Sequence, residues 1–167
     1  LSWLNGMWIR EDLTDEQLAD KLIEWALNKD RLLEFLPHAR QRMETFSDLA
    51  PLGSYLLSGK LDLTEEAICG GQEVDQVISI LQFALWRLEA MRSWQRDDIF
   101  SELKSVAEGM EVKLKPFLAP LFIAIAGSAA SISVMDSMVL LGPDMSRARL
   151  RGAIDVLGGV GKKKLKK

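Results

Sequence analysis

The 167-residue chain contains one cysteine, one histidine and one tyrosine. The single cysteine, Cys69, excludes a disulfide within the chain and fits a reducing compartment. The single histidine, His38, leaves no cluster of the side chains that metal sites use. No alternation of polar and apolar residues persists as strands require, and no internal repeat is present. These absences exclude a disulfide scaffold, a histidine-cysteine metal centre and a repeat protein.

Catalytic motifs are missing as well. The chain has no glycine-rich phosphate loop, no nucleophile paired with a base and no metal-ligand spacing. It has no signal or transit peptide, so we expect a cytoplasmic protein. The first residue, Leu1, is not a methionine, which indicates a piece of a longer protein. Nothing in these residues predicts an enzymatic reaction carried out by this chain alone.

The charge balance is slightly acidic. Lysine and arginine number 21 against 24 acidic residues, which gives a formal net charge of −3. Five of the basic residues lie in the tail at 162–167, and without them the net charge would be −8. Any contact with nucleic acid must therefore come from a local patch. The tail itself could attract RNA or simply keep the chain soluble.

An uncharged stretch at residues 116–135 is long enough to span a bilayer. Its content predicts two short buried helices instead. Gly127 is the type of residue that ends a helix, and Ser131 or Ser133 is suited to cap the start of the next one. We therefore expect no membrane span.

Capping residues and a period near 3.6 predict an all-α fold. Thr14 with Gln17 and Thr45 with Asp48 have the spacing of helix starts, and Gly109 that of a helix end. The longest regular segment should be central. The predicted helices cover residues 1–9, 14–27, 30–36, 38–43, 45–57, 72–91, 96–108, 115–126, 133–141 and 143–157, with a short helix before Gly70.

The chain contains five tryptophans but only one tyrosine. Trp3, Trp25, Trp86 and Trp94 lie in apolar helical patterns, where packing is the expected role. Trp86 follows Leu85 in the predicted central helix, and its truncation is expected to destabilise the fold.

Two segments at opposite ends of the chain resemble one family. Residues 1–10 (LSWLNGMWIR) are similar to the motif LxWLNGxYIR of bacterial glutamyl-tRNA synthetases, where it opens the helical tRNA-binding half. Residues 120–127 (PLFIAIAG), 140–142 (LLG) and 147–150 (RARL) resemble that family's closing signature, PLRxAxTG followed by LLG and an arginine-rich helix. Because both signatures occur in order, the resemblance covers nearly the whole chain.

The resemblance implies two packed helical subdomains, a helical bundle or helix cage. Residues 1–54 would be a connecting subdomain, 55–161 the anticodon-binding subdomain and 162–167 a basic flexible tail. The family's HIGH-like and KMSKS-like catalytic motifs are absent here. The chain would then position tRNA(Glu) for a catalytic domain in the same parent, a glutamate-tRNA ligase that uses ATP with Mg. The alternative is a stand-alone helical module that binds protein or another RNA.

The resemblance assigns anticodon contacts to three residues. Arg42 aligns with an arginine that reads the third anticodon base, and Arg40 is a further candidate. A guanidinium suits base reading because its donors form a fixed fork. The other interpretation is an arginine paired with Glu44 or Asp48. Ser131 and Val134 fall where the family contacts the first anticodon base near a helix start, although Ser131 could also be a plain cap.

Phe122 replaces the arginine of the family's PLRxAxTG motif. Either an aromatic face stacks on the first base, or Phe122 packs in the core and the contact is missing. The arginines of the last helix, Arg147, Arg149 and Arg151, could lie along the phosphate backbone. They could equally form the polar face that any amphipathic helix needs.

Overall fold

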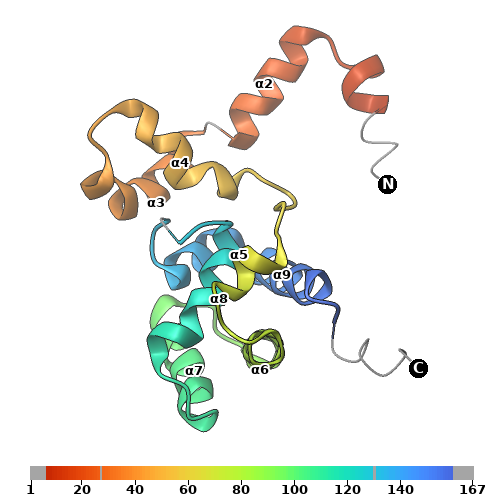
Figure 1. Cartoon of the computed structure of the whole chain (residues 1–167). Coiled ribbons are helices and arrows are strands. Elements are labelled where there is room, and N and C mark those ends of the chain that lie inside the picture. The colour runs from red at the N-terminus through yellow and green to blue at the C-terminus, as the bar shows by residue number, and fades with distance from the viewer. Residues whose placement is uncertain (1–6, 27, 130, 160–167) are drawn as a thin grey trace.

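The computed structural model describes residues 7–26, 28–129 and 131–159, and this part of the chain is helical without a strand (Figure 1). The all-α prediction is confirmed. Trp3, Leu27 and the tail at 162–167 lie outside the described residues. No helix in the described ranges is both long and apolar enough to cross a bilayer. The elements are η1 (Trp8–Asp12), α2 (Asp15–Ala26), α3 (Lys29–Ala39), η2 (Arg40–Arg42), η3 (Phe46–Asp48), α4 (Leu49–Gly53), η4 (Ser54–Leu56), α5 (Glu65–Cys69), α6 (Val74–Ala90), α7 (Arg96–Gly109), α8 (Leu114–Ala126) and α9 (Val134–Val156).

The helix starts follow the capping residues. The Gln17 N–H donates to Thr14 Oγ1 at 3.3 Å, and the Thr14 N–H donates to Gln17 Oε1 at 3.0 Å. Thr45 and Asp48 form a second capping box, which begins the short turn η3. These bonds satisfy donors that the first turn of a helix leaves free, so three or four residues suffice to fix each start.

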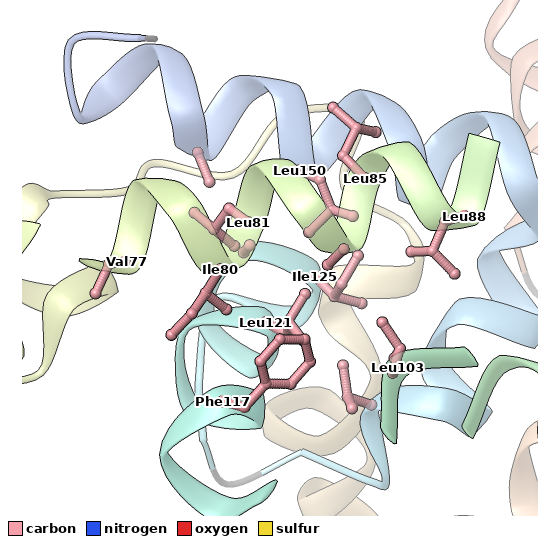
Figure 2. Close-up of a cluster of buried hydrophobic side chains, with 14 of the residues drawn as sticks. Val77, Ile80, Leu81, Leu85, Leu88, Leu103, Phe117, Leu121, Ile125 and Leu150 are labelled. Carbon is pink, nitrogen blue, oxygen red and sulfur yellow. The ribbon is translucent and has the colours of Figure 1, made fainter. Parts of the chain in front are cut away.

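The main hydrophobic core surrounds α6 (Figure 2). This helix contributes Val77, Ile80, Leu81, Leu85 and Leu88, all fully buried or nearly so, at the spacing of one helical face. Side chains from α7, α8 and α9 close the core around that face, among them Leu103, Phe117, Leu121, Ile125 and Leu150. The predicted central role of α6 is confirmed.

A second, smaller cluster lies under α3 and α4. Phe35, Ala39 and Leu52 pack there with Ile132, which comes from the loop between α8 and α9. The first part of the chain is thus joined to the second through that loop. The existence of two cores agrees with two packed subdomains, while a boundary between residues 54 and 55 stays a prediction.

The helix α2 has no buried residue, which corrects the expectation that Trp25 packs inward. The side chains of Leu22 and Trp25 are about half exposed, at 49% and 53%. Figure 1 shows α2 on the far side of α3 and α4 from the main core. Periodicity indicates an apolar face on this helix. It does not indicate whether another part of the described chain covers that face.

Helix ends were predicted less well than helix starts. Gly127 has the expected left-handed conformation, with φ of 72°. α7 ends at Gly109, one residue later than predicted, but Gly109 itself is helical and Glu111 takes the positive φ, 58°. Between residues 134 and 156 the predicted break falls at Gly142, whose φ of 79° and ψ of 169° kink α9. The Ser146 hydroxyl donates to the Gly142 carbonyl at 2.8 Å across this kink.

Trp86 corrects another sequence expectation. It is 53% exposed, although it lies in α6 beside Leu85 and Leu88. The buried stripe of α6 runs through residues 81, 85 and 88, and the side chain at 86 projects about 100° away from that at 85. Its ring makes an edge-to-face contact with Phe83, itself on the surface, at a centroid distance of 5.4 Å.

Replacing Trp86 by alanine is therefore expected to change the free energy of unfolding by only about 1 kcal/mol or less. The substitution mainly removes the ring pair with Phe83 on the surface, and exposed substitutions have small effects. A urea titration followed by circular dichroism measures this. A loss above about 3 kcal/mol would mean that Trp86 is buried in solution after all.

Candidate nucleic-acid interface

Two predicted site residues, 89 positions apart, meet in the structure. Arg42 ends the turn η2, and its Nη1 donates to the carbonyl oxygen of Ser131 in the loop between α8 and α9. No carboxylate pairs with the Arg42 guanidinium within the described part of the chain, so pairing with Glu44 or Asp48 is not what the structure contains. The contact places an arginine at the junction between the two helical parts.

Asp48 is engaged elsewhere. Its carboxylate accepts from the backbone N–H groups of Glu44 and Thr45, at 2.8 and 2.7 Å. The bonds from Thr45 first and Glu44 second lower the pKa of Asp48, because they favour the charged carboxylate. These bonds fix the segment that follows Arg42 as one rigid turn.

The loop that receives Arg42 presents little of its predicted site side chains. Ser131 and Val134 are only 4% and 1% exposed. The Ser131 hydroxyl lies 3.2 Å from the Ile132 carbonyl and 3.4 Å from the Ser128 carbonyl, so it bonds within the loop. Ser133 takes the predicted cap position of α9, but its side chain makes no capping bond. The outer face of the loop is formed by Ser128 and Ala129.

The first turns of α9 are tied to α3, η4 and α7 by polar contacts that sequence reasoning missed. Asp136, whose side chain is 13% exposed, lies 3.1 Å from Arg96 Nε and 3.6 Å from His38 Nδ1. The Tyr55 and Ser137 hydroxyls are 2.7 Å apart. Burial raises the pKa of Tyr55, which therefore stays neutral at physiological pH. The site loop is anchored on its α9 side by these contacts.

Arg149 is placed in the interior, which corrects its expected role as a phosphate contact. The residue is 6% exposed, and Nη1 donates to the Ile125 carbonyl. Nη2 donates to the carbonyls of Tyr55 and Ser58, both at 2.6 Å. Burial lowers the pKa of the guanidinium. The ordinary pKa of arginine is so high that the group stays protonated. Arg149 therefore holds the end of α8 against the end of η4.

The other two arginines of the last helix differ from each other. Arg147 is partly buried, donates to the Leu88 carbonyl at 2.8 Å and lies over the Trp94 ring at 5.3 Å. Most of its donors thus face the protein. Arg151 is exposed and forms an ion pair with Glu89. Of the three, Arg151 has the most exposed side chain.

Phe122 packs partly against the main core, which fits the core interpretation of this residue. Its remaining surface lines an open groove with Leu118 and with Ala129 of the site loop. The position where the family has an arginine is therefore apolar but not sealed. A role for Phe122 in reading a base stays a prediction.

Arg40 is exposed, and no ion pair engages it among the residues described. It lines a groove together with Pro37, Met43 and Phe46. In the same ranges, no group of three or more histidine, cysteine or acidic side chains is arranged to hold a metal ion. The chemistry available here is that of an arginine-bearing turn beside a structured loop.

A helical scaffold that brings an arginine turn against the loop before a helix suits recognition of unpaired nucleotides. The chain belongs to the family described as the anticodon binding domain, which matches residues 17–154. This match runs through both hydrophobic clusters.

Several similar proteins are named glutamate--tRNA ligase. The chain is 58% identical to that of Saccharophagus degradans over 168 residues and 58% identical to that of Cellvibrio japonicus over 167. The identity to the Marinomonas protein is 52%. These alignments cover 99 to 100% of this chain but only 33 to 34% of each relative. The chain thus spans about a third of the length of the curated relatives that it matches.

Proposed function

We propose that this chain is the anticodon-recognition portion of a glutamate-tRNA ligase and holds tRNA(Glu) for a catalytic domain in the same parent. The observation that carries the proposal is the contact between Arg42 and the Ser131 carbonyl. It joins the two segments to which the resemblance assigns anticodon contacts. Membership of the anticodon-binding family and the names of the relatives support it.

Arg42 is suited to read the third anticodon base. One of its five N–H donors is used by Ser131, which restrains the guanidinium and leaves the other donors for a base edge. A donor fork held in advance loses less conformational freedom on binding. The first base would then meet the backbone of the loop at residues 128, 129 and 131–133, since the Ser131 and Val134 side chains are buried.

The parent supplies the remaining chemistry. It would use ATP with Mg to activate glutamate in a domain that lies outside this chain, and it would act in the cytoplasm. Within this chain, Arg40 and Arg151 are the exposed candidates for contacts with the RNA backbone. Such contacts give affinity without sequence information.

Replacing Arg42 by glutamine is expected to weaken binding of tRNA(Glu) by about 1 to 3 kcal/mol, the value of a bidentate base contact. A tRNA with a different third anticodon base should be affected little, because the arginine makes no such contact with it. Fluorescence titration of wild-type and variant chains with both RNAs at two salt concentrations measures the difference.

The matched control is Arg151→Gln. Arg151 is exposed and lies on the last helix. Its loss should therefore weaken the binding of both RNAs equally and lower the salt dependence of binding by about one phosphate contact. If Arg42→Gln also weakens the binding of both RNAs equally, Arg42 contacts the RNA backbone and does not read a base. If neither RNA binds the wild-type chain, the stand-alone module becomes the better explanation.

A further inference from the structure

Phe46 is the most exposed large apolar residue described, at 97%. It begins the turn η3, four residues after Arg42. An extended chain of four residues spans at most about 14 Å, so the Cα atom of Phe46 lies within that distance of the Cα atom of Arg42, the proposed base-reading residue. An aromatic ring left in water contributes nothing to the core, and its removal should leave the fold intact.

The exposure of Phe46 is not a result of a loose segment. The two bonds from the Thr45 and Glu44 amides to the Asp48 carboxylate close the turn around it. Thr45 and Asp48 also complete the capping box on either side of the ring. These bonds therefore hold the backbone from which the Phe46 side chain projects into solvent.

The surroundings of the ring combine apolar and cationic groups. Phe46 lines two adjoining grooves, and Leu32 and Leu49 are common to both. Arg40 lines the second groove and has no ion-pair partner among the described side chains. Glu44 is the only acidic residue in that groove's lining. Phe46 and Arg40 thus line the same groove, together with apolar side chains such as Leu32 and Leu49.

We propose that Phe46 is a stacking platform for an unpaired base of the anticodon loop, next to the base that Arg42 reads. This inference rests on the proposed function, because it places a second nucleotide beside the first. Single-stranded RNA is bound by aromatic faces for the bases and by cations for the backbone, and Phe46 with Arg40 supplies one of each. A protein partner would be expected to fill the apolar grooves without using the Arg40 charge.

The test uses the 167-residue chain and a tRNA(Glu) anticodon stem-loop that carries 2-aminopurine just 3′ of the third anticodon base. Phe46→Ala is expected to weaken binding about 5- to 150-fold, the effect of losing one base stack. It should also abolish the quenching of 2-aminopurine that stacking on the ring causes. Phe46→Trp should retain both the affinity and the quenching.

The control is Trp86→Ala, which removes another exposed aromatic ring, from α6. It should bind and quench like the wild-type chain. Unfolding curves of all variants should coincide within about 1 kcal/mol, the span expected for exposed substitutions.

Three outcomes would overturn the inference. If the wild-type chain binds no stem-loop, the proposed function fails, and the stacking role of Phe46 fails with it. If Arg42→Gln loses base discrimination while Phe46→Ala binds and quenches normally, only the stacking role fails. If Phe46→Ala abolishes a concentration-dependent self-association of the chain and leaves RNA binding unchanged, the ring belongs to an interface between copies.

Discussion

Replacing Arg149 by methionine is expected to lower the free energy of unfolding by about 3 to 5 kcal/mol. The substitution keeps the apolar stem but removes the donors that reach the carbonyls of Ile125, Tyr55 and Ser58. Each buried acceptor left without a partner costs roughly 1 to 3 kcal/mol. The Ile125 carbonyl lies in the last turn of α8, where the helix dipole favours a cation. Urea denaturation monitored by circular dichroism provides the measurement.

Arg151→Met is the matched control. It makes the same chemical change two residues further along α9, where the side chain is exposed and pairs with Glu89. An exposed ion pair contributes about 1 kcal/mol or less. Equal midpoints for the two variants would refute the structural role of Arg149. Arg149→Lys should lie between wild type and methionine, since one ammonium cannot reach three carbonyls as a planar fork does.

Truncating Phe117 to alanine is expected to cost about 3 to 5 kcal/mol, because a buried ring is removed and a cavity remains. Phe117 is fully buried and faces the α6 stripe from α8 (Figure 2). Phe83→Ala is the control of identical chemistry, since Phe83 is 47% exposed. The same denaturation experiment applies to both. Similar losses at the two positions would contradict the assignment of the core.

The helical fold could be predicted because its signals are local. A threonine and the residue three positions later fix a helix start through two hydrogen bonds, as at Thr14 and Thr45. Gly127 and Gly142 mark breaks because few other residues adopt a positive φ. Gly109 is the last helical residue of α7, but the positive φ falls two residues later, on Glu111.

The roles of individual side chains depended on partners far away in the sequence. Arg149 resembles any arginine on an amphipathic helix until the carbonyls 91 and 94 residues earlier are brought beside it. Trp86 and Trp25 lie beside apolar stripes, and only the packing decides which side of each stripe is covered. The exposure of Phe46 likewise gives no sequence signal. The resemblance to the family predicts that Arg42 and Ser131 contact the anticodon. Their contact with each other is visible only in three dimensions.

The long separation between Arg149 and its partners has a consequence for how the chain is made. Helix pairs such as α6 with α7 can form soon after they leave the ribosome, because their contacts are local. The carbonyls of Tyr55 and Ser58 must wait for Arg149, which is synthesised 94 and 91 residues later. At about 5 to 20 residues per second, this delay lasts roughly 5 to 20 s. During translation the η4 turn is therefore made well before Arg149, the residue that holds it against α8.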